Sequence, residues 1–97
     1  MKERFKSGDI DNLFRAFMSL ESIDECYDFF EDLCTVAEIH EMAKRLTAAK
    51  MLSDGAKYND VAEKTGLSSA TISRVNRSLK YGADGYKKVL ERINYEE

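Results

Sequence analysis

The sequence predicts an all-α fold, and three observations support this class. The chain of 97 residues contains no proline, so no residue type that breaks a helix interior by ring geometry is present. Its five glycines fall at the junctions between apparent helical segments. Apolar residues recur at intervals of three and four, which is the spacing of one helix face. A chain of this length is expected to form a single domain over residues 1–97.

Two helices are predicted in the N-terminal third of the chain. An acidic start leads into an apolar stripe over residues 12–20. Ser22 and Glu25 then have the spacing of a capping box, which satisfies free backbone N–H groups at a helix start. A second helix over residues 23–34 follows, with acidic side chains between its apolar positions.

A long third helix is predicted after a second capping box. Thr35 and Glu38 repeat the spacing of the first box, and the helical pattern continues to Gly55. Residues from about 9 to 55 are expected to form the helices of a dimerisation core. A short amphipathic helix over about residues 83–94 is expected to end the fold.

Residues 58–80 have the pattern of a helix-turn-helix. Ala62 is small where the two helices would cross, and Gly66 ends the first helix where a left-handed backbone is needed. Either Ser68 or Ser69 is suited to cap the second helix. The angle between the helices is filled by three apolar residues: Leu67, Ile72 and Val75. An ordinary helical hairpin with a glycine turn would share some of these features.

A helix-turn-helix presents the outer side of its second helix to the major groove of DNA. Small side chains at the entering end would meet base edges, and basic side chains would meet phosphates. The alternative for each lysine is a solvated surface charge. The candidate DNA-contacting residues are Lys57, Asn59, Lys64, Ser68, Ser69, Ala70, Ser73, Arg74, Arg77 and Lys80.

Charge is distributed unevenly along the chain. Residues 1–43 contain eleven acidic and four basic residues, whereas residues 44–92 contain eleven basic and five acidic residues. The net charge of the whole chain is −3. The basic part includes the predicted helix-turn-helix, where phosphate contacts are needed, and the acidic part is expected to lie away from the duplex.

Large apolar residues are concentrated in the first half of the chain: Phe5, Phe14, Phe17, Tyr27, Phe29, Phe30 and Leu33. The short helices of one small chain cannot easily bury this set, and each large side chain left in water forgoes about 1.5–3 kcal/mol. We therefore expect a homodimer whose N-terminal helices form the interface. The alternative is the compact core of a single monomer.

Several other classes of protein are not expected. No apolar run approaches the roughly 20 residues that span a membrane, and no apolar stretch of a signal peptide follows the first residues. We therefore expect a cytoplasmic protein without membrane association. Cys26 and Cys34 have neither redox nor zinc spacing, and the single histidine, His40, argues against a metal site. An enzyme is not expected, because no nucleophile and base are suggested by the sequence.

Residues 70–74 and 76–80 are similar to the recognition helix of the Trp repressor family, and in particular to its YerC/YecD-like branch of small bacterial proteins. The resemblance covers most of the chain and is strongest over residues 35–92. It implies six helices per chain and an intertwined homodimer, in which the N-terminal helices and the last helix form a shared core.

The resemblance also implies a site for a small-molecule corepressor. Guanidinium and hydroxyl groups in that family suit a carboxylate or a flat polar ring. Structural roles are an alternative, such as an N-cap at Thr35, an ion pair at Arg45 or a hydrogen bond of Thr71 within its helix. The positions that match the corepressor site are Thr35, Arg45, Thr71, Arg74 and Ser78.

One departure from the family concerns the ligand itself. The family has a glycine directly after the arginine of the recognition helix, whereas this chain has Val75. A branched side chain would fill the space for an indole, so tryptophan is not the expected ligand. No cofactor is expected, and the open alternatives are an unregulated protein or one that senses a different small molecule.

These observations predict a sequence-specific DNA-binding transcriptional regulator, of the repressor type, that binds a near-palindromic operator as a dimer. The alternative is a protein-interaction adaptor that uses the helix-turn-helix surface to bind a protein partner. The acidic first half and the small outward residues of the second motif helix are compatible with that alternative.

Overall fold

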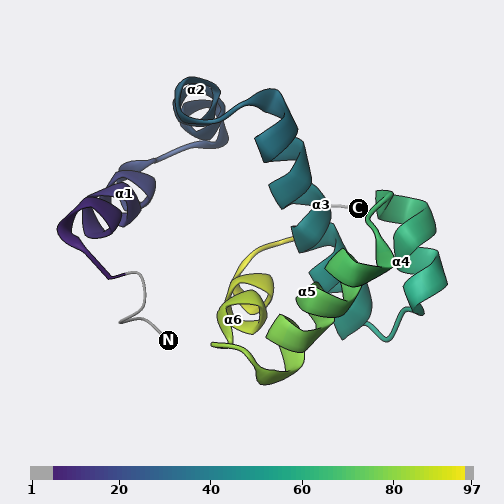
Figure 1. Cartoon of the computed structure of the whole chain (residues 1–97). Coiled ribbons are helices and arrows are strands. Elements are labelled where there is room, and N and C mark those ends of the chain that lie inside the picture. Colours follow the sequence, from purple (N-terminus) through teal and green to yellow (C-terminus); the bar gives the residue numbers. More distant parts are fainter. Residues whose placement is uncertain (1–5, 96–97) are drawn as a thin grey trace. The chain divides into compact units, whose positions relative to one another are not determined.

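The structure, a computed structural model, describes residues 6–95 and is shown in Figure 1. Over this range it consists of α-helices without a β-strand, which confirms the predicted all-α class. Among the described helices, none combines the length and hydrophobicity that crossing a membrane requires. The six described helices are α1 (Gly8–Ser19), α2 (Ile23–Leu33), α3 (Val36–Ser53), α4 (Tyr58–Thr65), α5 (Ser69–Tyr81) and α6 (Gly85–Arg92).

The chain divides into two compact units, and the boundary lies between Val36 and Ala37 at the start of α3. Helices α1 and α2 belong to the N-terminal unit, and α4 to α6 belong to the C-terminal unit with nearly all of α3. The expectation of a single domain over residues 1–97 stays a prediction.

Side-chain caps define the starts of both helices in the N-terminal unit. At α1 the Ser7 hydroxyl accepts a hydrogen bond from the Ile10 N–H at 3.2 Å. At α2 the Ser22 hydroxyl accepts from the Glu25 N–H at 3.1 Å, as the predicted capping box requires. In a capping box the glutamate side chain accepts from the N–H of the cap residue, here Ser22. The Glu25 carboxylate instead accepts from the N–H of the preceding residue, Glu21, at 3.0 Å.

Phenylalanine rings form the centre of the N-terminal unit. The centroid of the Phe17 ring lies 5.3 Å from that of Phe30 and 6.0 Å from that of Phe29. No residue of α1 or α2 is fully buried, however. Phe5, which we expected to join this apolar set, lies outside the described residues. Several large apolar side chains of the unit remain exposed: Phe14, Met18, Ile23, Tyr27, Leu33 and Val36.

The C-terminal unit is built around the second half of α3, against which α4, α5 and α6 pack (Figure 1). Ala48 and Ala49 of α3 are fully buried, and their small side chains allow the neighbouring helices to approach closely. Val61 of α4 and Ile72 of α5 are the largest fully buried side chains. The cluster is completed by Leu67 and Val75 and is covered by the partly buried Met51, Leu52, Ala56, Ala62, Tyr86 and Leu90.

The turn between α4 and α5 has the geometry that the sequence predicts. Gly66 adopts φ 73° and ψ 8°, a left-handed conformation that is least costly without a Cβ atom. The buried Thr65 hydroxyl bridges the turn, because it donates to the Val61 carbonyl at 2.7 Å and accepts from the Leu67 N–H at 3.2 Å. These bonds fix the path of the chain from α4 into α5.

The C-terminal segment is held against α3. Helix α5 ends at Gly82, where a Cβ atom would collide with the Ser78 carbonyl oxygen. After α6, the Tyr95 hydroxyl donates a hydrogen bond to the Thr47 hydroxyl at 2.7 Å. This bond ties the end of the described chain to the middle of α3.

Candidate nucleic-acid interface

Helix α5 has one buried and one exposed side. Ile72, Val75 and Leu79 are buried on the core side. Of the two serines suited to cap this helix, Ser68 is the N-cap, since its hydroxyl accepts from the Thr71 N–H at 3.2 Å. The predicted DNA-contacting residues within the helix are all exposed: Ser69, Ala70, Ser73, Arg74, Arg77 and Lys80.

The other predicted DNA-contacting residues are also exposed. Lys57 is the residue directly before α4, and Asn59 and Lys64 lie within α4. Ser68 occupies the corresponding position directly before α5. The structure therefore places the whole predicted set on α4, α5 and their first flanking residues, within one compact unit.

The basic side chains of α4 and α5 are not neutralised by carboxylates in the part of the chain that the structure describes. Exposed arginines without a carboxylate partner retain their donors and charge for a phosphate. Arg74 and Arg77 are in this situation. Ion pairs that the structure places on other elements include Arg45 with Glu41 (3.7 Å), Lys50 with Asp54 (3.2 Å) and Lys87 with Asp84 (3.8 Å).

A polar pair that the sequence did not suggest joins the two helices of the motif. The Asn76 side-chain amide of α5 donates a hydrogen bond to the Tyr58 hydroxyl of α4 at 2.9 Å. Tyr58 is 39% exposed and Asn76 is partly buried. The pair therefore lies at the edge of the core, where the start of α4 meets the middle of α5.

The residues predicted for an effector are divided between the two units. Arg45 pairs with Glu41 at 3.7 Å, and the Thr71 hydroxyl accepts from the Ser68 hydroxyl at 3.1 Å, so both have structural partners. Val75 is buried in the core cluster, which agrees with its packing role. The N-terminal unit contains one predicted effector residue, Thr35, and the C-terminal unit contains the other four, Arg45, Thr71, Arg74 and Ser78.

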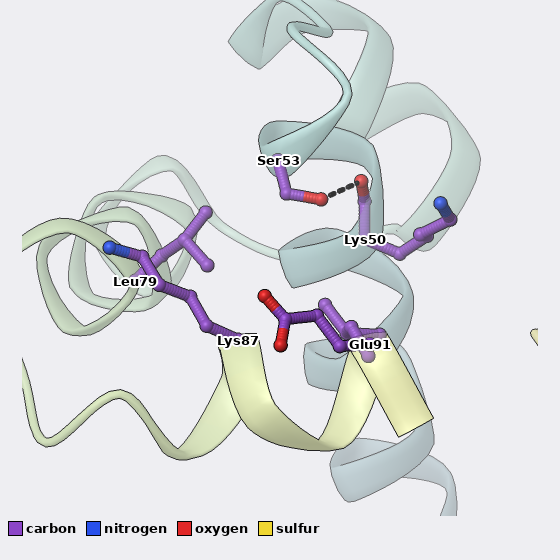
Figure 2. A pocket seen from close by; sticks show the side chains of 6 residues that line it. Lys50, Ser53, Leu79, Lys87 and Glu91 are labelled. Carbon is purple, nitrogen blue, oxygen red and sulfur yellow. Dashed lines mark hydrogen bonds between the residues drawn. The ribbon is translucent and has the colours of Figure 1, made fainter. Parts of the chain in front are cut away.

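An open pocket of about 240 Å³ lies between α3, α5 and α6. Figure 2 shows the Glu91 carboxylate directed into the space between the helices. The Ser53 hydroxyl, which donates to the Lys50 carbonyl at 2.8 Å, lies at the same space. The pocket shares no residue with the predicted effector set, since its lining consists of Lys50, Ser53, Leu79, Lys87, Leu90 and Glu91.

Comparison with known proteins agrees with this architecture over nearly the whole chain. The sequence is 44% identical over 95 residues to the uncharacterized protein YerC of Bacillus subtilis (strain 168). The alignment covers 98% of this chain and 91% of that protein. The crystal structure of a TrpR like protein from Eubacterium eligens ATCC 27750 superposes with a TM-score of 0.91 at 53% identity and covers 98% of both chains.

A second crystal structure, from Staphylococcus aureus, superposes with the same TM-score of 0.91 at 46% identity, over 99% of this chain and 96% of the other. The six-helix fold is therefore the one that the resemblance implied. The family described as Trp repressor protein matches residues 8–94. With nine-tenths of its length inside that match, the chain belongs to the Trp repressor protein family.

Proposed function

We propose that this protein is a sequence-specific DNA-binding transcriptional regulator of the repressor type, which binds a near-palindromic operator through its helix-turn-helix. One observation carries the proposal. Helix α5 buries Ile72, Val75 and Leu79 while its opposite side exposes small residues together with unpaired arginines. That combination suits a helix inserted in a major groove, with small side chains against base edges and guanidinium groups against phosphates.

The proposal includes a homodimer that acts in the cytoplasm. Two copies of α5 related by a two-fold axis would enter successive major grooves about 34 Å apart. The exposed apolar side chains of α1 and α2 support this part of the proposal, because a second copy of the chain would remove them from water. Membership of the Trp repressor protein family supports it independently.

Selection from a random duplex pool, followed by binding measurements across salt concentrations, tests the function. A plot of log affinity against log salt concentration falls with a slope set by the number of phosphate contacts. Arg77→Ala and Lys64→Ala are each expected to make this slope less steep by about one, since each would remove one phosphate contact. Arg15→Ala is the matched control, because Arg15 is an exposed arginine of α1 outside the motif. Failure of the wild-type chain to enrich or retain any duplex would contradict the proposal and favour the protein-interaction adaptor.

We further propose that tryptophan is not the corepressor. Val75 belongs to the buried core cluster. It stands at the position where the resemblance implies a glycine, and a branched side chain there would fill the space expected for an indole. Calorimetric titration of the purified protein with tryptophan is therefore expected to give no saturable heat at micromolar concentrations. Saturable binding in that range would contradict this proposal and leave DNA binding itself in place.

A further inference from the structure

The hydrogen bond between Asn76 and Tyr58 determines which further hydrogen bond the tyrosine hydroxyl can form. In this bond the Asn76 amide is the donor and the Tyr58 oxygen is the acceptor, at 2.9 Å. A phenolic hydroxyl both accepts and donates, so the Tyr58 proton is left for a second acceptor. The bond also restricts the position of the oxygen, because the two residues lie on different helices.

The surroundings of this hydroxyl favour an anionic acceptor. Tyr58 is the first residue of α4, between the exposed Lys57 and Asn59. The first helix of a helix-turn-helix crosses the DNA backbone, while the second helix enters the groove. Tyrosine hydroxyls are among the side-chain groups that donate to phosphate oxygens in protein–DNA complexes.

We propose that the Tyr58 hydroxyl is a further phosphate-binding group of this interface, and that Asn76 is the residue that positions it. The inference rests on the proposed DNA-binding function and adds two residues to it. A neutral donor that is already fixed between two helices loses little side-chain freedom on binding, so it contributes affinity without base preference.

Fluorescence anisotropy with two labelled duplexes tests the inference, one selected from a random pool and the other a scrambled duplex of the same length and composition. Tyr58→Phe keeps the ring and removes only the hydroxyl, so it is expected to weaken binding to both duplexes by about tenfold. The salt slope is expected to stay unchanged, because a neutral hydroxyl displaces no counterion. Tyr81→Phe is the matched control, since Tyr81 is 83% exposed at the end of α5.

A double-mutant cycle separates the two roles. Asn76→Ala is expected to weaken binding to both duplexes, and the double variant Tyr58→Phe/Asn76→Ala is expected to bind no more weakly than Tyr58→Phe alone, because Asn76 acts through the hydroxyl. Thermal unfolding without DNA shows whether each variant is folded. If Tyr58→Phe does not fold, Asn76→Asp replaces it, since a carboxylate would accept the Tyr58 proton and turn it away from DNA.

The possible results are distinguishable. Binding of folded Tyr58→Phe, or of Asn76→Asp in its place, within twofold of wild type on both duplexes would overturn this inference alone. Loss confined to the selected duplex would also overturn it, because it would show that the pair sets the base contacts of α5 instead. Absence of duplex binding by the wild-type chain would overturn this inference and the proposed function together.

Discussion

Ile72 is fully buried within the cluster that joins α3, α4 and α5. Truncation to alanine would remove three carbon atoms and leave a cavity that close-packed neighbours cannot fill. We expect Ile72→Ala to lower the free energy of unfolding by about 3 kcal/mol, and Ile72→Val by about 1 kcal/mol. Urea unfolding followed by circular dichroism measures both. Equal stability of the alanine variant and wild type would contradict the observed packing.

Gly66 provides a second test at a single residue. Its φ of 73° is left-handed, and a side chain there costs about 1–2 kcal/mol for backbone reasons alone. Gly66→Ala is therefore expected to destabilise the chain although no atom lies within 4 Å of the added Cβ. Gly85→Ala is the control, because Gly85 begins α6 with equally open space and without a left-handed φ. It is expected to be neutral or stabilising by up to about 1 kcal/mol, so destabilisation of equal size in both variants would contradict this explanation.

Some individual residues could be predicted from sequence and others could not. Gly66 was predictable because the left-handed backbone at the end of a helix favours glycine, and Leu67 because an apolar residue at this spacing indicates burial. The bond between Tyr58 and Asn76 was not, because its partners are 18 residues apart and partly exposed polar side chains have no periodic pattern. The choice between Ser68 and Ser69 also needed coordinates, since both residues are serines and serine favours the cap position.

At the scale of the helix, the cap of α5 is expected to affect stability measurably. The Ser68 hydroxyl accepts from the Thr71 N–H at 3.2 Å and donates to the Thr71 hydroxyl at 3.1 Å. We expect Ser68→Ala to lower the free energy of unfolding by about 1 kcal/mol, measured without DNA. Ser69→Ala, one residue later and exposed, is expected to change it by less than about 0.5 kcal/mol. The reverse order would show that the helix begins one residue later than observed.

The helix boundaries were largely predictable, for reasons that differ between helices. Ser22 has local chemistry that starts a helix and Gly66 has local chemistry that ends one, so the start of α2 and the end of α4 follow from a few neighbouring residues. The left-handed Asp84 before α6, with φ 65°, was not predictable, because aspartate adopts this conformation only occasionally. In α3 the apolar spacing predicted a helix but not which positions are buried, since Met42 is exposed whereas Ala48 is enclosed.

At the scale of the whole molecule, the two units differ in how completely they bury their apolar residues. The C-terminal unit has a cluster of fully buried side chains, whereas α1 and α2 contain no buried residue. The sequence indicated that apolar side chains of the first half would remain exposed, because the large apolar residues there are more than the short helices of one chain can bury. The sequence could not indicate which of these side chains are exposed to solvent, since their exposure depends on how Phe17, Phe29 and Phe30 pack against one another.

The proposed homodimer can be tested at the most exposed of these residues. Met18 is 85% exposed near the end of α1, and Ile23 is 75% exposed at the start of α2. If a second chain covers them, Met18→Glu would bury a charge in an apolar interface. In sedimentation equilibrium the wild-type chain is then expected to be a dimer and Met18→Glu a monomer. Ser19→Glu adds the same charge at the neighbouring exposed position and is expected to leave the dimer intact.

Dimer formation also couples stability to concentration. The midpoint of thermal unfolding is expected to rise with protein concentration for wild type and Ser19→Glu, because mass action favours the associated folded state, and to lose this dependence in Met18→Glu. Since each operator half-site would hold one α5 helix, the monomeric variant is also expected to lose most of its affinity for a two-site duplex. A wild-type chain that sediments as a monomer at every concentration would contradict the dimer and leave the exposed apolar side chains to another partner.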